Sequence, residues 1–108
     1  MTNAYLIDPV TRTVKEVTYN GDYNQIYTLT DCDTFTCVMF NEHSDTIFVD
    51  DEGLFKSDQQ FFHVQGYPQP LAGKGLILGT NDEGESVSPV IGYEDFCKLV
   101  TFPVMVSA

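Results

Sequence analysis

Residues 34–40, Thr-Phe-Thr-Cys-Val-Met-Phe, and residues 46–50, Thr-Ile-Phe-Val-Asp, form the stretch that decides the fold class. In an extended chain the apolar side chains of the first run fall on both faces, with Phe35, Cys37 and Met39 together on one of them. Apolar side chains on both faces are typical of a strand that is covered on both sides, so the first run predicts a central strand. The second run follows a polar connector and predicts the other half of a hairpin.

The segment before this hairpin predicts a second hairpin and a short helix. Residues 4–7 form a short apolar run, turn chemistry follows from Asp8, and residues 13–19 alternate between two faces. Apolar residues then recur near helical spacing, which predicts a helix over residues 22–30 with Asp22 as its N-cap.

The segment after it predicts shorter strands and a second helix. Strands are expected over residues 61–64, 75–79 and 86–90, with a surface loop over 66–75 and either a turn or a strand over 54–60. The helical spacing of Tyr93, Phe96, Cys97 and Val100 predicts an amphipathic helix over residues 93–100. The apolar tail from Phe102 to Val106 is expected to be a last edge strand.

These elements predict the fold class. No repeat, linker or low-complexity segment interrupts the 108 residues, so we expect one domain over residues 1–108. Its class is α+β, with a mostly antiparallel sheet of about five to seven strands and two short helices.

The charge balance excludes some classes of partner. The chain has 16 acidic and 5 basic side chains, a net charge of −11, and a protein that binds nucleic acid or an anionic membrane directly needs a basic face. The N-terminus lacks the pattern of a secretory signal, and no apolar run reaches the roughly 20 residues of a membrane helix. Three cysteines without paired spacing suit a reducing compartment, so a cytoplasmic location is expected.

The acidic residues are clustered. Residues 42–58 and 81–95 together hold 11 of the 16 acids. If both windows lie on one side of the sheet, they create a negative face that attracts a host protein with a basic surface, in the limit as a mimic of phosphates. The expected contact residues are Asp50, Asp51, Glu52, Asp82, Glu83 and Glu85. The alternative is that these acids only keep a small domain soluble or reflect a high-salt source.

The loop over residues 66–75 suggests a different site. Tyr67, Gly73, Lys74 and Gly75 could form a pocket for a small ligand such as a nucleotide, with Lys74 meeting a phosphate. The spacing is not that of a P-loop. The alternative is a connector rich in proline and glycine with a solvated lysine.

Metal binding and catalysis have little support in the sequence. Neither Asp50–Glu52 nor Asn81–Glu85 has the EF-hand pattern, and the four potential zinc ligands Cys32, Cys37, His43 and His63 are poorly spaced. A nucleophilic cysteine would have to be Cys32, activated by one of the two histidines, because Cys37 and Cys97 fall on apolar faces and are expected to be buried. We therefore predict no catalytic residues, no metal and no cofactor.

The order of motifs resembles a family of small proteins of unknown function found in bacteriophages, prophages and plasmids. The resemblance rests on I-D-P at residues 7–9, D-C-D-T-F-T at 31–36, V-D-D-E-G-L at 49–54, and G-K-G-L-I-L-G with D-E-G-E-S-V-S between residues 73 and 88. These are turn and strand motifs, so no functional residue is carried over. The resemblance implies an accessory protein that inhibits, sequesters or redirects a host factor.

The sequence as a whole predicts a non-enzymatic acidic accessory protein that binds and modulates a host protein, including one that handles nucleic acid. Two alternatives stay open: a protein that binds or sequesters a nucleotide, and a structural or virion component. The apolar tail from Phe102 to Val106 could pair with a second copy, and such homo-oligomers would favour the structural or virion component.

Overall fold

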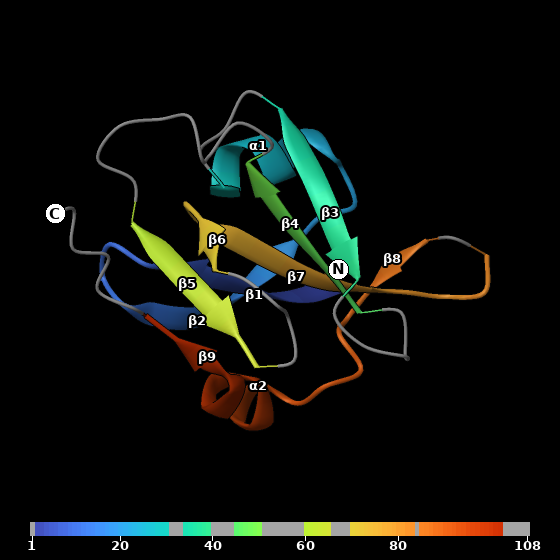
Figure 1. Ribbon diagram of the computed structural model, residues 1–108. Coiled ribbons are helices and arrows are strands. Elements are labelled where there is room, and N and C mark those ends of the chain that lie inside the picture. Colours follow the sequence, from blue (N-terminus) through green and yellow to red (C-terminus); the bar gives the residue numbers. More distant parts are fainter. Residues whose placement is uncertain are drawn as a thin grey trace, which may run out of the picture.

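The main structural element is an antiparallel sheet in which five strands follow the order β2 (Thr13–Tyr19), β1 (Thr2–Asp8), β7 (Gly75–Thr80), β4 (Thr46–Asp50) and β3 (Phe35–Met39) (Figure 1). A short sixth strand, β8 (Ser86–Val87), also pairs with β7. The computed structural model describes residues 2–30, 34–39, 45–50, 60–65, 70–83 and 85–102.

A smaller sheet and two helices complete the architecture. The small sheet has the order β6 (Leu71–Ala72), β5 (Phe61–Val64) and β9 (Val100–Thr101). Helix α1 (Asn24–Thr30) lies on one face of the large sheet, whereas helix α2 (Tyr93–Leu99) and strand β5 lie on the other. The described part of the chain is therefore α+β with mostly antiparallel sheet, as the sequence predicts.

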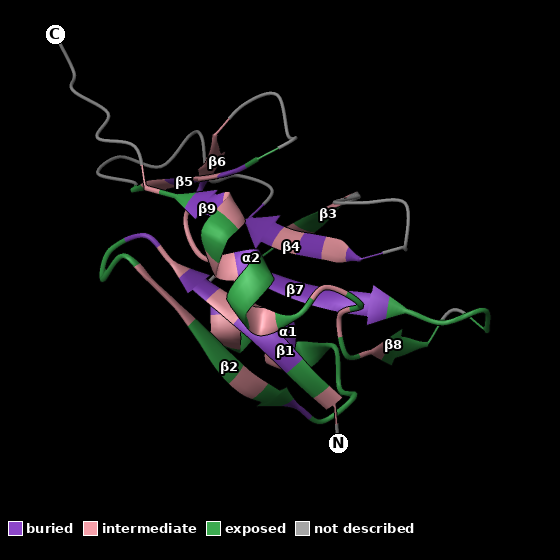
Figure 2. Cartoon of the chain, turned by 90° about the horizontal axis from the view of Figure 1, so that it is seen from below, coloured by how far each residue is buried: buried purple, intermediate pink, exposed green. Residues whose placement is uncertain are grey.

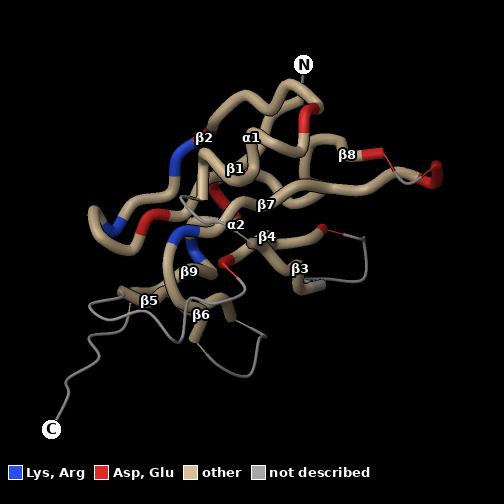
Figure 3. The backbone as a smooth tube through the Cα atoms, turned by 90° about the horizontal axis from the view of Figure 1, so that it is seen from above, with Lys and Arg blue, Asp and Glu red and all other residues tan. Residues whose placement is uncertain are grey.

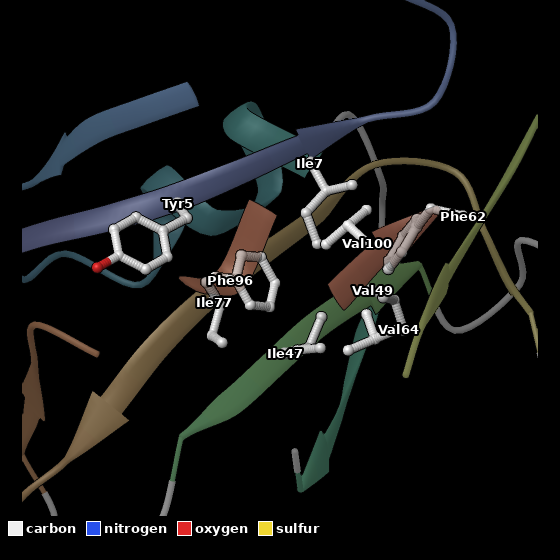
Figure 4. Packing of buried hydrophobic residues seen from close by; sticks show 9 residues of the cluster. All are labelled: Tyr5, Ile7, Ile47, Val49, Phe62, Val64, Ile77, Phe96 and Val100. Atoms are coloured by element: carbon white, nitrogen blue, oxygen red, sulfur yellow. The ribbon is translucent and has the colours of Figure 1, made fainter. Parts of the chain in front are cut away.

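Each face of the large sheet has its own hydrophobic cluster. The cluster under α1 contains Ala4, Tyr19, Ile26, Leu76 and Leu78. The cluster on the other face is larger, and Figure 4 shows its side chains converging from β1, β4, β5, β7 and the α2–β9 segment. Strand β7 contributes to both, because Leu76 and Leu78 point to one face and Ile77 to the other. All three are at most 1% exposed, and β7 is buried almost to its end (Figure 2).

Several local predictions are confirmed. The β1–β2 and β3–β4 hairpins form with continuous pairing, from Thr2 opposite Tyr19 to Asp8 opposite Thr13 and from Phe35 opposite Asp50 to Met39 opposite Thr46. The α1 helix forms in the predicted segment, and the Asp22 carboxylate accepts a hydrogen bond of 3.0 Å from the Asn24 backbone N–H at its start. Such a bond satisfies one of the N–H groups that the first turn of a helix leaves unpaired.

The prediction that residues 34–40 form a central strand of the sheet is wrong. Strand β3 lies at the end of the strand order, and β7 holds the central position. Alternation reports whether the two faces of a strand are apolar, but it carries no information about its lateral neighbours. Cys37 was expected to be buried and is exposed, and Cys97 is half-buried.

Three C-terminal predictions need correction. The strand expected over 86–90 stops at Val87, because the N–H groups of Val90 and Ile91 bond to a carboxylate and not to a strand. The loop expected over 66–75 contains strand β6, and its residues 66–69 lie outside the described part. The last strand, β9, begins at Val100 and ends before Phe102; residues 103–106 of the expected tail strand, and residues 54–59, are also outside it.

The buried carboxylate of Asp45 ties two distant segments together. Asp45 is 0% exposed and lies just before β4. Its two oxygens accept hydrogen bonds of 2.8 and 3.0 Å from the backbone N–H groups of Val90 and Ile91, which lead into α2. Because a buried charge is costly unless it is hydrogen-bonded, this contact fixes where the connection from β8 to α2 crosses the sheet.

We expect Asp45→Ala to lower the free energy of unfolding by about 2–4 kcal/mol, because it leaves the N–H groups of Val90 and Ile91 without this acceptor. Asp45→Asn should cost less, since its amide oxygen can still accept one of the bonds. Urea unfolding followed by circular dichroism measures both. Asp82→Asn, at an exposed carboxylate, is the control and should change stability by no more than about 0.5 kcal/mol. Equal stability of wild type and Asp45→Ala would contradict the assignment.

Glycine is required at position 75, where β7 enters the core. A Cβ atom at Gly75 would lie 2.6 Å from Cζ of Phe62 and 3.3 Å from Cγ2 of Ile47. Phe62 is fully buried, so its ring cannot swing into solvent to make room. The absence of a side chain at Gly75 is what allows β5 to pack so closely over β7.

Gly75→Ala should therefore destabilise the protein by about 1–3 kcal/mol through overpacking. The matched control is Gly92→Ala, where the nearest atom to the new Cβ, Oδ2 of Asp95, is 3.9 Å away. Combining Gly75→Ala with Phe62→Leu should recover part of the loss, because the smaller side chain relieves the contact. The urea midpoints of wild type, the Gly92→Ala control, both single variants Gly75→Ala and Phe62→Leu, and the double variant measure this, and additive effects in the double variant would argue against a direct clash.

Candidate functional site

The turn between β7 and β8 presents a group of exposed carboxylates at one end of the molecule. Asp82, Glu83 and Glu85 are all exposed, and Figure 1 shows this turn projecting beyond the body of the protein. We call residues 81–85 the acidic tip; its residue 84 is outside the described part.

The backbone of the acidic tip is ordered by one side chain. Oδ1 of Asn81 accepts hydrogen bonds of 2.9 Å from the backbone N–H groups of both Glu83 and Glu85. The Asn81 N–H donates to the carbonyl oxygen of Glu85 at 3.0 Å. Asparagine suits this place because its short amide can bond to the backbone a few residues on. The tip thus holds its carboxylates on a preformed turn.

The structure does not bring Asp50 to the acidic tip. Val49 is opposite Gly75 in the β4–β7 pairing, so Asp50 lies beyond the start of β7, whereas the tip follows its end at Thr80. A strand rises about 3.4 Å per residue, which separates the two places by roughly 17 Å. Asp50 is also only 8% exposed. The expected single acidic face needs correction at this residue, and Asp51 and Glu52 lie outside the described residues.

The charges of the described residues are distributed asymmetrically. Arg12, Lys15, Lys74 and Lys98 are the basic residues of this part of the chain. Figure 3 shows them on the side of the molecule away from the acidic tip. Because an exposed charge is screened over about 10 Å at ordinary ionic strength, a partner near the tip experiences mainly its carboxylates.

A small pocket lies at the opposite end of β7. It is lined by side chains or backbone from five separate segments, and its volume is about 110 Å³. The lining residues are Pro9, Val10, Thr30, Asp50, Gln60, Gly73 and Lys74.

Two of the four residues predicted for a ligand site line this pocket. Lys74 is half-buried, and Gly73 has a φ of +81°, a conformation that glycine adopts without strain. Gly75 is buried in β7 under Phe62 and does not line the pocket, and Tyr67 lies outside the described residues. Asp50, Thr30 and Gln60 were not predicted to line this pocket, because nothing local in the sequence indicates that these segments meet.

The surroundings of three tyrosines raise the pKa of their hydroxyl groups. Burial raises the pKa of Tyr5 and of Tyr19 above the ordinary value of a phenol, with smaller contributions from nearby acids. A hydrogen bond with the Cys97 side chain is the main cause that raises the pKa of Tyr93. The Tyr5 hydroxyl donates to the carbonyl oxygen of Ile91 at 2.8 Å, and the Tyr93 hydroxyl donates to that of Val14. These protonated hydroxyls fasten α2 and its connection to the sheet.

The residues considered for metal binding and nucleophilic chemistry are dispersed. Cys37 lies on β3 and His63 is half-buried on β5, opposite Thr101 of β9. Cys32 and His43 lie outside the described part of the chain. Within residues that the structure describes, no three His, Cys, Asp or Glu side chains are grouped so that they could hold a metal ion. In the same part of the chain, no helix has the length and apolar character needed to cross a bilayer.

Comparison with known proteins identifies relatives of the chain. A family described as "Domain of unknown function (DUF3846)" matches residues 1–98. The "Uncharacterized protein y4iR" of Sinorhizobium fredii (strain NBRC 101917 / NGR234) is 36% identical over 114 residues, an alignment that covers 97% of this chain and 70% of that protein. No solved structure matches the chain. The predicted resemblance to a family of unknown function is confirmed, and the chain belongs to the DUF3846 family.

Proposed function

We propose that this protein is a non-enzymatic binding module that uses the acidic tip to dock on a basic surface of another protein. The observation that carries the proposal is the ordered turn, on which Asn81 holds the exposed residues Asp82, Glu83 and Glu85. A preformed turn loses little conformational freedom on binding, so more of the electrostatic attraction remains as affinity.

The partner class follows from the sign of the charge. A net charge of −11 repels nucleic acids and anionic membranes, and it steers encounters with basic surfaces. A host protein that handles nucleic acid presents such a surface, because it must bind phosphates. Occupying that surface would modulate the host protein in the cytoplasm, the role expected of an accessory protein of a phage or other mobile element.

The test compares two triple variants with the same change in net charge, from −11 to −8. The tip variant is Asp82→Asn/Glu83→Gln/Glu85→Gln. The control is Glu16→Gln/Glu94→Gln/Asp95→Asn, which neutralises three exposed acids of β2 and α2. Exposed ion pairs contribute about 0.2–1 kcal/mol each, so losing three at the tip should weaken binding by about 0.6–3 kcal/mol in total.

The measurement is quantitative capture of proteins from a bacterial lysate on the three immobilised proteins, washed at low salt and at ~0.5 M salt. The expected result is a basic protein that wild type and the control variant retain at low salt and that the tip variant loses. Purified, it should bind the tip variant with a lower association rate and a flatter salt dependence. Capture that is equal on all three proteins, or weakened to the same degree by both triple variants, rejects the acidic tip as the contact.

A second function is suggested by the pocket that contains Lys74. Its volume of about 110 Å³ is well below the ~300–1,000 Å³ of sites that enclose a whole organic ligand, so it would take one phosphate or carboxylate group and leave the rest of a nucleotide outside. A ligand that binds only the folded protein raises its melting temperature.

We expect a panel of nucleotides and inorganic phosphate at ~5 mM to raise the melting temperature of wild type and of the tip variant equally, and to leave Lys74→Gln unshifted. A shift that survives Lys74→Gln would place the ligand elsewhere, and no shift with any compound would remove this second function.

A further inference from the structure

Strand β3 has the composition of a central strand but lies at the edge of the sheet. Its five residues, Phe35–Met39, include no charged residue and no proline. Edge strands are usually protected by charges, prolines or covering elements, because their unpaired backbone groups are a template for pairing with another chain. Among the described residues, β4 is the only strand that pairs with β3.

The opposite edge of the sheet is protected. Strand β2 carries Lys15 and Glu16, which are both exposed. The carbonyl oxygen of Val14 accepts a hydrogen bond from the Tyr93 hydroxyl, and that of Thr18 accepts one of 3.1 Å from Nε2 of Gln25. Helices α2 and α1 thus each contribute a side chain that occupies one outer carbonyl of β2. Among the described residues, side chains from the helices bond to the outer edge of β2, whereas no hydrogen bond between them reaches the outer edge of β3.

The alternation of the ladder shows which groups of β3 point outward. The Asn3 N–H bonds to Oγ of Ser88, next to β8, so the odd-numbered residues of β1 direct their backbone groups toward β7. Successive residues of a strand direct their backbone groups to opposite sides, so the same alternation can be followed through the β1–β7, β7–β4 and β4–β3 pairs. It shows that Thr36 and Val38 direct their backbone N–H and C=O groups toward β4. The N–H and C=O groups of Phe35, Cys37 and Met39 therefore point away from the sheet.

Among the elements that the structure describes, the face of the sheet next to this edge is covered only in part. Helix α1 has seven residues and packs over β4 and β7. Phe35 and Phe48 remain half-buried and Cys37 is exposed. The rings of Phe35 and Phe48 continue a row of aromatic contacts that begins at Tyr27 of α1. The ring centroids of Tyr27 and Phe35 are 4.8 Å apart, and those of Phe35 and Phe48 are 5.5 Å apart. An apolar strip thus extends from the helix to the outer strand.

We infer that β3 pairs with β3 of a second copy of this chain, antiparallel and centred on Cys37, to form one sheet through both copies. A two-fold axis perpendicular to the sheet places Cys37 opposite Cys37 and Phe35 opposite Met39 of the second copy. In this register the outward N–H groups of each strand meet the outward carbonyls of the other. Both α1 helices lie on the same face, and β3 becomes the central strand that its composition predicts.

The charges favour a second copy over a basic partner at this edge. The uncharged β3 offers a basic segment no carboxylate of its own, whereas two copies of β3 bring no like charges together within the strand pair. The acidic tip lies on the β8 side of β7, and β4 and β3 extend from its other side. The width of β7, β4 and β3 in both copies therefore separates the two tips, and at ordinary ionic strength their like charges are screened over that separation. This interface is separate from the one proposed for the partner protein.

The test is the oligomeric state of the full chain, measured by sedimentation velocity from ~1 μM to ~500 μM. Wild type should form a dimer that dissociates on dilution. Cys37→Lys places two ammonium groups opposite each other on the axis, and Cys37→Pro removes an outward N–H that β4 does not use. Each should raise the dissociation constant about tenfold or more, because directly opposed like charges and lost ladder bonds destabilise strand pairing. Cys37→Ser keeps the N–H and adds no charge, so it should remain a dimer.

Two further variants complete the design. Glu16→Pro makes the proline change at the β2 edge and should leave the dimer intact, and the tip variant should also remain a dimer, so failure of one proposal is distinguishable from failure of the other. Thermal unfolding confirms that each variant is folded. If Cys37→Pro does not fold, Cys37→Lys decides, since its exposed side chain leaves the monomer undisturbed.

Oxidative cross-linking tests the register. In Cys32→Ser/Cys97→Ser, which retains Cys37 alone, paired Cys37 residues would have Cα atoms about 5.5 Å apart, within the range of a disulfide. Copper phenanthroline should convert most of this protein to a disulfide-linked dimer at a concentration where wild type is dimeric. A monomer at every concentration overturns the inference. A dimer that persists in Cys37→Lys and Cys37→Pro also overturns it and would indicate another interface, such as the apolar tail.

Discussion

The structure depends on burying both faces of one strand. Leu76 and Leu78 of β7 face the helix α1 layer, Ile77 faces the α2 and β5 layer, and none of the three is more than 1% exposed. A sheet with apolar residues on both faces must be covered on both, which requires elements from distant parts of the chain. Phe62 packs so closely on Gly75 that a Cβ atom at that position would lie 2.6 Å from its ring. The positions of β1, β4 and β5 follow from covering both faces of β7.

Polar contacts fix the positions of the helices and of the β8–α2 connection, which apolar packing alone does not determine. Asp45 holds the segment that leads from β8 to α2, and the Tyr5 hydroxyl reaches the same segment at Ile91. Tyr93 and Gln25 then join the two helices to the outer carbonyls of β2. Each of these bonds joins a loop or helix to the sheet, so together they both orient the covering elements and protect one edge.

The proposed interfaces use different parts of this arrangement. The acidic tip projects from one end of β7 and offers charge on an ordered turn, which suits recognition of a basic surface. The β3 edge offers backbone groups and apolar side chains without charge, which suits pairing with an identical strand. A dimer formed in this way would present two acidic tips related by a two-fold axis. Two linked tips would bind a partner with two basic sites more tightly than one tip, because the second contact becomes intramolecular.

Local patterns were enough to determine the α+β class, both hairpins, the position of α1 with its Asp22 cap, the start of α2 and the strand at residues 75–79, because each depends on residues close in sequence. The exposed acids Asp82, Glu83 and Glu85 were also identifiable, since a polar turn between apolar runs must lie at the surface. Strand order, the burial of Asp50 and the meeting of Asp50 with Lys74 in one pocket were decided only by the tertiary structure. Each depends on which distant segments become neighbours, and that choice minimises exposed apolar surface over the whole chain rather than within any one segment.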